Sequence, residues 1–252
     1  MSDRSDGERL TGYHVVLLLL LGFTTLYEGF DASMLTLASV DVRQTLDISR
    51  DEWGNLYAIT RAGVVASFFF LMLADRWGRR GLLLLTVAGF AVSSGATAFV
   101  TTKEGFTFWQ TLARLFLTAQ FGLAVIIAGE ELPARLRGTG ITILTAFATV
   151  GTVAMAKASP WFLLLEDSPG NVVDDLAMGL VALGNGWLGP AGDGAPWRGL
   201  YLVGAVPLLF LPVLALGVRE TERFRQIASG RTSLRLAETV AAQFSEARRL
   251  LE

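Results

Sequence analysis

The sequence predicts an all-α, polytopic membrane protein with six transmembrane helices, and three observations lead to this prediction. Of its 252 residues, 52% are hydrophobic and only 17% are charged, whereas a soluble domain carries roughly a quarter charged residues. The apolar residues are gathered into blocks, several of which reach the roughly 20 residues that a membrane-spanning helix needs. A short run from Leu73 to Arg80, with three arginines and a glycine, joins two of these blocks and must therefore lie at one membrane face.

Each apolar block gives one expected helix. The six helices are expected over Tyr13–Val40, Trp53–Leu73, Leu82–Val100, Phe106–Ile127, Ile141–Ser159 and Gly199–Gly217. They form a membrane domain of residues 13–218, between an N-terminal segment of residues 1–12 and a charged tail of residues 219–252. The first block is too long for a cleaved signal peptide and lacks a small-residue cleavage pattern.

The distribution of basic residues predicts the orientation, because short cytoplasmic loops carry an excess of Lys and Arg. The residues assigned to the cytoplasm are Arg4, Arg9, Arg76, Arg79, Arg80, Arg135, Arg137, Arg219, Arg223, Arg225, Arg231, Arg235, Arg248 and Arg249. Those assigned to the outside are Arg43, Arg50, Lys103, Lys157 and Arg198. We therefore expect both termini in the cytoplasm and the helices in a bacterial-type inner membrane or a plasma membrane.

Two segments have open interpretations. A long outside loop covers residues 160–198, and its part from Val172 to Leu188 is either a short helix on the membrane surface or an irregular loop. In the tail, the apolar residues Leu236, Val240, Phe244 and Leu251 recur at helical spacing. The tail is therefore either an amphipathic cytoplasmic helix or a solvated extension.

The composition argues against several classes of protein. The chain has no cysteine and one histidine, so neither a thiolate nor a histidine-rich metal site is expected. The net charge of −2 suggests no nucleic-acid partner. We find no nucleophile–base pair and no phosphate-binding loop, so we expect no enzyme, no catalytic residue, no metal and no cofactor.

The first helix carries two carboxylates, Glu28 and Asp31, three residues apart and therefore on one helix face. An ionisable group at bilayer depth is costly, so it usually faces a cavity or a partner. Two neighbouring carboxylates in a low dielectric favour holding a proton, which suits proton transfer during transport. The alternative is that both lie at the outer water interface, ionised and solvated.

Three further polar residues fall inside expected helices. Arg61 lies roughly 12 Å below the outer end of the second helix, Arg114 lies at a similar depth in the fourth, and Gln120 lies further in. Two arginines that face the bundle interior would attract an anion or pair with Glu28 and Asp31. The alternative is a buried ion pair that only fixes helix packing.

The fifth helix and its approach are rich in small residues. They are Thr139, Gly140, Thr142, Thr145, Ala146, Ala148, Thr149, Gly151, Thr152, Ala154 and Ala156. Small residues let helices approach closely, and they can equally line a transport pathway. Both readings stay open.

Three motifs at the cytoplasmic face resemble those of the major facilitator superfamily of transporters. The run Leu71–Arg80 is similar to that family's signature G-x-L-A-D-R-x-G-R-R, with Leu71 in place of the first glycine. The run Glu130–Gly138 is similar to E-x-x-P-x-x-x-R-G, and Arg219–Phe224 to P-E-[ST]-x-R-F without its proline. The last two motifs are typical of the sugar-porter and metabolite:proton symporter branches.

The resemblance implies roles for particular residues. In the family, charged residues of these motifs form an ion-pair network that closes the cytoplasmic side, and an arginine at the position of Arg114 takes part in proton coupling. The residues implied in this cytoplasmic gate are Asp75, Arg76, Gly78, Arg79, Arg80, Glu130, Arg137, Glu220 and Arg223. The alternative is that the basic turn only enforces topology. We expect Glu28, Asp31, Arg61, Arg114 and Gln120 to handle substrate or protons.

The resemblance also implies that this chain is one half of a transporter. Transporters of this family join two six-helix halves around a substrate site near the bilayer midplane, and this chain corresponds to the N-terminal half. We expect a secondary active transporter of a small polar metabolite such as a sugar or an organic acid, coupled to protons and working by alternating access in the lipid bilayer. The second half is expected from a split or truncated gene or from a homodimer. The alternative is a non-transporting membrane subunit or sensor.

Overall fold

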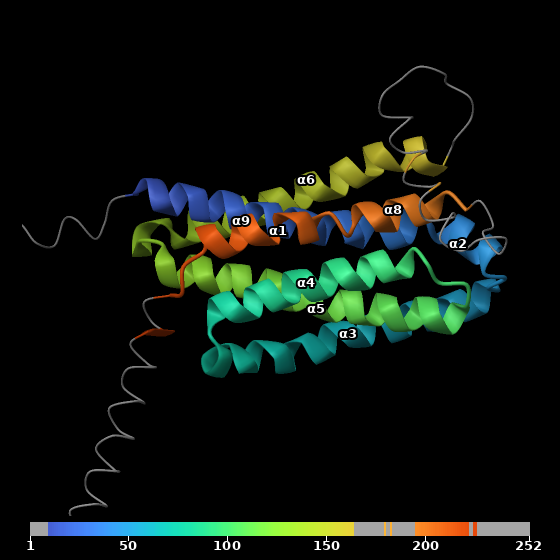
Figure 1. Ribbon diagram of the computed structural model, residues 1–252, viewed down its shortest axis with the longest axis horizontal. Helices are drawn as coiled ribbons and strands as arrows, with labels where there is room; N and C mark the ends of the chain where they lie inside the picture. Colours follow the sequence, from blue (N-terminus) through green and yellow to red (C-terminus); the bar gives the residue numbers. More distant parts are fainter. Residues whose placement is uncertain (1–9, 164–178, 180–181, 183–194, 222–223, 226–252) are drawn as a thin grey trace, which may run out of the picture.

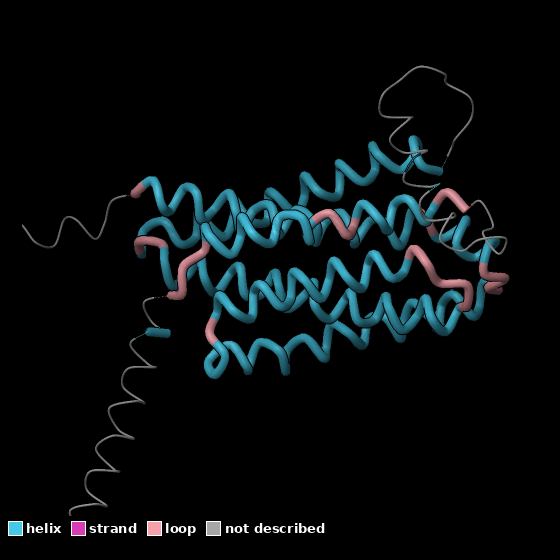
Figure 2. The backbone as a smooth tube through the Cα atoms, viewed as in Figure 1, coloured by secondary structure: helices cyan, strands magenta, loops and turns pink. Residues whose placement is uncertain are grey.

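The computed structural model is all-helical, which confirms the predicted fold class (Figures 1 and 2). It describes residues 10–163, 179, 182, 195–221, 224 and 225. The elements are α1 (Gly12–Leu37), α2 (Ser39–Thr45), α3 (Arg50–Trp77), α4 (Arg79–Thr97), α5 (Lys103–Glu131), the 3-10 turn η2 (Ala134–Leu136), α6 (Arg137–Leu163), α8 (Trp197–Val203) and α9 (Pro207–Gly217). The two segments with open interpretations, Val172–Leu188 and the tail beyond residue 225, lie outside the described residues except for Gly179 and Ala182.

Six stretches of the described chain are long and apolar enough to cross a membrane, and they correspond to the six expected helices. Most begin earlier or end later than the apolar blocks alone predict, because polar residues cap them. Before α3, the Ser49 hydroxyl accepts the Glu52 N–H at 3.2 Å, while Glu52 accepts the Ser49 N–H at 3.0 Å. This reciprocal cap satisfies two N–H groups at the helix start and places the start of α3 at Arg50.

Some helix ends differ from the expected ones. The first span ends at Leu37 and the third at Thr97, each three residues before the expected Val40 and Val100, and after Leu37 the chain continues into the short α2. The sixth span is not one helix: α8 ends at Val203, and α9 begins at Pro207. Proline has no N–H to continue a helix but fits its first turn, so the break falls immediately before Pro207.

The spans run side by side along the long axis of the molecule (Figure 1). The end that carries Gly78 and Gly217 is called the inner end here, after the predicted orientation, and the opposite end the outer end. The helix α1 packs mainly against α6, α5 packs against both α3 and α4, α1 also contacts α5, and α4 contacts α8 and α9. The contact between α1 and α5 brings Asp31 and Arg114 together.

The helices α1 and α6 cross with their backbones in close contact. A Cβ at Gly29 would overlap the carbonyl oxygen of Ala148, and a Cβ at Gly151 would overlap that of Leu26. Next to this crossing, the Thr152 hydroxyl donates to the Gly29 carbonyl at 3.3 Å. The small residues on this face of the fifth span therefore serve close packing, as the first of the two sequence readings expects.

The side chain of Leu71 fits because the neighbouring helix has a glycine opposite it. A Cβ at Gly122 of α5 would lie 2.9 Å from Leu71 Cδ1. The small residue that the family signature places in the second span is thus replaced by a glycine on its neighbour, and the close packing is kept.

Both ends of α4 are capped, one by the sixth span and the other by the segment that follows it. At the outer end, the fully buried Arg198 donates to the carbonyls of Ala98 at 2.7 Å and Val100 at 2.8 Å. At the inner end, the Glu220 carboxylate accepts the N–H of Arg79 at 2.8 Å and that of Arg80 at 3.3 Å. A cation at the C-terminus and an anion at the N-terminus of a helix both complement its dipole, so the sixth span clamps α4.

Candidate functional site

A buried ion pair joins the first and fourth spans. The Asp31 Oδ2 atom of α1 lies 3.0 Å from the Arg114 NH2 atom of α5, and their side chains are 1% and 8% exposed. The interpretation that Asp31 is solvated at the outer interface is therefore wrong. Removing water from two charges is expensive unless they pair, and here two predicted site residues come together.

Two further residues of the predicted site lie along the same contact between α1 and α5. Glu28 is half-buried and close enough to Asp31 and Arg114 to interact with both charges. Gln120, six residues further along α5 than Arg114, is buried and donates to the Thr24 carbonyl of α1 at 2.7 Å. The site is thus a polar seam between α1 and α5.

Arg61 is not part of this seam. Its side chain is exposed on α3, where it donates to the Tyr57 hydroxyl and lies 4.8 Å from the centre of the Tyr57 ring. The structure does not bring Arg61 to the Asp31–Arg114 pair, because Gly63 is the residue of this turn that packs against α5. Two helical positions are roughly 200° apart around the axis, so Arg61 points away.

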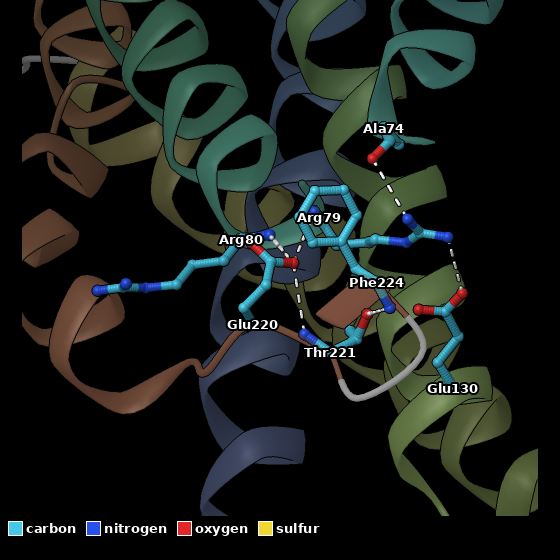
Figure 3. Close-up of polar contacts among 7 residues, drawn as sticks. All are labelled: Ala74, Arg79, Arg80, Glu130, Glu220, Thr221 and Phe224. Carbon is cyan, nitrogen blue, oxygen red and sulfur yellow. Dashed lines mark hydrogen bonds and ion pairs between the residues drawn. The ribbon is translucent and has the colours of Figure 1, made fainter. Parts of the chain in front are cut away.

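A second polar cluster lies at the inner end (Figure 3). The Arg79 NH2 atom lies 3.1 Å from Glu130 Oε1, with side chains 4% and 9% exposed, and Arg79 NH1 reaches the Ala74 carbonyl at 3.4 Å. Glu220 approaches from the other side and caps α4 through the N–H of Arg79. The turn between α3 and α4, the end of α5 and the segment after α9 thus meet at Arg79.

The remaining gate residues fall into three groups. Arg80 donates to the Ala215 carbonyl of α9 at 2.6 Å, while Arg137 donates to the nearby Leu132 carbonyl at 3.2 Å. Gly78 has a φ of +87°, a conformation that favours glycine, and a Cβ there would lie 2.6 Å from Glu220 Oε2. The side chains of Asp75 and Arg76 and the whole of Arg223 lie outside the described residues.

Sequence reasoning missed one member of this cluster. The Phe224 ring lies 5.4 Å from the Arg79 guanidinium in a cation–π arrangement. The sequence does contain Phe224 as the last residue of the third motif, but the motif alone does not show that its ring contacts Arg79. Among the described residues, no group of three or more His, Asp or Glu side chains is placed to hold a metal ion.

We predict that Glu220→Ala destabilises the chain by about 1–2 kcal/mol, because two N–H groups at the start of α4 lose their acceptor and the helix dipole loses its anion. The measurement is unfolding in detergent micelles followed by circular dichroism. Glu104→Ala is the matched control, since Glu104 is exposed in the first turn of α5, where Thr102 already caps the helix. Equal stability losses in the two variants would contradict the capping role.

Comparison with known proteins agrees with this architecture. The chain is 26% identical over 164 residues to the gallate transporter of Pseudomonas putida, covering 65% of this chain and 36% of that one. It is 24% identical over 213 residues to the 3-(3-hydroxy-phenyl)propionate transporter of Escherichia coli, covering 82% and 45%. The fold is similar to the crystal structure of a D-xylose-proton symporter, with a TM-score of 0.66 and 15% identity over 91% of this chain and 54% of that one.

The chain spans less than half the length of these two curated relatives. Its six membrane spans match one half of the fold of the solved transporters. The family model of the Major Facilitator Superfamily matches residues 21–250. The chain is therefore an integral membrane protein of the Major Facilitator Superfamily, a family of small-metabolite transporters and not of enzymes.

Proposed function

We propose that this chain is the N-terminal half of a proton-coupled transporter of small organic acids. The observation that carries the proposal is the Asp31–Arg114 pair, an acid and a base that are both buried at bilayer depth between two spans. Charged residues inside a membrane protein are costly and therefore mark ion or proton routes by default. A pair with only a structural role would give no more stability than apolar residues of similar volume, which pack as well or better.

In the proposed cycle, a proton on Asp31 releases Arg114. Once Asp31 is neutral, the Arg114 guanidinium lacks a counter-ion, and the carboxylate of a substrate takes that place. Arginine binds carboxylates through two parallel hydrogen bonds. Proton binding and anion binding then favour each other, which is the linkage that symport requires.

The choice of organic acids over sugars follows from the same chemistry. Gallate and 3-(3-hydroxyphenyl)propionate, named for two relatives, are aromatic carboxylates that suit an arginine. The similar symporter fold is that of a D-xylose transporter, so a sugar is the competing substrate class. Half-buried Glu28 would then be the more important acid, because carboxylates bind sugar hydroxyls.

We also propose that the inner cluster around Arg79 closes the cytoplasmic side. Its Arg79–Glu130 pair is largely withdrawn from solvent, so its strength exceeds that of an exposed pair. The cluster joins segments from four spans, and separating them on inward opening breaks several bonds at once. Such a cluster biases two conformations of nearly equal free energy.

The test is uptake of radiolabelled benzoate-type acids and of sugars by cells that express the chain, with any coding sequence that continues past residue 252. We expect Asp31→Asn and Arg114→Gln to reduce proton-driven uptake to the background while the protein still reaches the membrane. Asp51→Asn is the matched control, because Asp51 is an exposed acid at the start of α3. Unchanged uptake in either site variant would overturn the assignment.

The proposal also needs a second six-helix unit, and cross-linking identifies its source. The chain has no cysteine, so a single cysteine introduced at the exposed Val153 of α6 reports on contacts between copies. Disulfide-linked dimers in membranes would show a homodimer. A continuing reading frame with six further apolar segments would show a longer polypeptide. If no dimer, no second six-helix half and no transport were found, the alternative of a non-transporting membrane subunit would be supported.

A further inference from the structure

The core next to Asp31 contains a tyrosine whose hydroxyl has no partner. Tyr201 of α8 is 0% exposed, and its hydroxyl oxygen is buried without a hydrogen bond among the described residues. A buried polar atom usually finds a partner, because leaving it unpaired costs free energy. The Tyr201 hydroxyl therefore asks for an explanation.

The Asp31 carboxylate has a hydrogen-bond acceptor without a donor. Its Oδ2 atom pairs with Arg114, but its Oδ1 atom is buried with no hydrogen-bond partner in the described part of the chain. A carboxylate accepts hydrogen bonds on both oxygens, whereas a phenol donates one. One unpaired donor and one unpaired acceptor thus occur in the same region.

Packing holds the tyrosine close to the ion pair. Tyr201 belongs to the apolar cluster that includes Phe30 and Met34, the residues that flank Asp31 along α1. The tyrosine is also near enough to Asp31 and Arg114 to interact electrostatically with both. Its hydroxyl is thus in the electrostatic field of the ion pair without being bonded to it.

Two aromatic side chains pack against the ring of Tyr201, and its hydroxyl oxygen moves only when the ring moves. Phe106 and Trp197 pack edge-on against the ring, with centroids 5.8 Å and 5.7 Å away. The backbone of Tyr201 accepts a hydrogen bond from Ser94 at 3.2 Å, and its neighbour Arg198 is tied to the end of α4. The sixth span is broken after Val203, so α8 is a short helical unit separate from α9.

We propose that Tyr201 is a positioning residue for the proton-handling pair: when α8 moves toward α1 in the transport cycle, its hydroxyl donates to Asp31 Oδ1 and completes a three-residue cluster of α1, α5 and α8. Its role in proton transfer rests on the proposed function above. In that role the hydrogen bond orients the Asp31 carboxyl group when Arg114 turns to an anionic substrate.

The test is infrared spectroscopy of the chain in lipid nanodiscs over a range of pH. The C=O stretching band of protonated Asp31 is assigned by its loss in Asp31→Asn. A hydrogen bond to the C=O group lowers its stretching frequency, so Tyr201→Phe is expected to move this band to a higher wavenumber. Tyr13→Phe is the matched control, because the Tyr13 hydroxyl is also buried without a described partner but lies near the inner end. An Asp31 band that does not move in Tyr201→Phe would overturn the proposal.

A double-mutant cycle decides the matter if no Asp31 band appears. The unfolding constants of Tyr201→Phe, Asp31→Ala and the double variant are expected to deviate from additivity by about tenfold, the size of one hydrogen bond to a charged group. Additive effects would overturn the proposal. Neither measurement requires flux, so failure here is distinguishable from failure of the uptake test.

Discussion

Replacing Gly29 by alanine is expected to separate α1 from α6 and to destabilise the chain by more than about 3 kcal/mol, beyond the usual cost of overpacking a core. The added methyl group would overlap the backbone oxygen of Ala148, and backbone cannot rotate away as a flexible side chain can. Gly151→Ala is expected to cost a similar amount, because its methyl group would overlap the carbonyl of Leu26. The measurement is reversible unfolding in micelles, together with the monodisperse fraction after purification.

Two controls make this expectation specific. Gly54→Ala adds the same methyl group in α3, where nothing lies within 4 Å of it, and is expected to be neutral or stabilising because alanine favours helix more than glycine does. The double variant of Gly29 and Gly151 is expected to cost much less than the two single costs together, since helices that have moved apart accept the second methyl group. Wild-type stability in Gly29→Ala would show that α1 and α6 do not cross as described.

The second large effect concerns the buried ion pair. Asp31→Ala is expected to destabilise the chain by about 3–5 kcal/mol, because it leaves the Arg114 charge buried without a counter-ion. Replacing both residues together, as Asp31→Leu with Arg114→Met, is expected to restore most of that stability, since apolar side chains of similar volume replace a buried pair at little cost. Thermal unfolding in nanodiscs measures both effects.

The matched control is the exposed pair at the outer end. Lys103→Ala removes the partner of Glu52, which lies 2.6 Å away, and both side chains are more than 40% exposed. Its removal is expected to change stability little, because water already solvates both charges. If Asp31→Ala were as mild as Lys103→Ala, the Asp31–Arg114 pair would not be withdrawn from water in the membrane.

The fold was largely predictable because its signals are local. Each span is an apolar block of membrane length, and the basic run Leu73–Arg80 marks one membrane face. The break in the sixth span was not predicted, although Gly204 and Pro207 stand at it, because glycine and proline are common within unbroken membrane helices. Hydropathy therefore finds a span without revealing whether its helix is continuous.

The candidate site was predictable only in part. Charge at bilayer depth identified Asp31 and Arg114, whose pairing follows from the contact between α1 and α5. The same rule did not show that Arg61 lies apart from this pair, because depth along a helix does not tell which side of the helix faces its neighbours. Tyr201 could not be identified from the sequence for a different reason. A tyrosine in an apolar block looks like an ordinary core residue, and only the structure shows that its hydroxyl is unpaired.

The clamp on α4 has a consequence for how the protein is made. The carbonyls at the outer end of α4 and the N–H groups at its inner end find their partners in Arg198 and Glu220, which leave the ribosome about a hundred residues after α4 does. Until then the third span lies in the membrane without these hydrogen-bond partners at either end. Assembly of the six helices is therefore completed by the last of them, and a nascent chain stalled after the fifth span should be a ready substrate for membrane proteases.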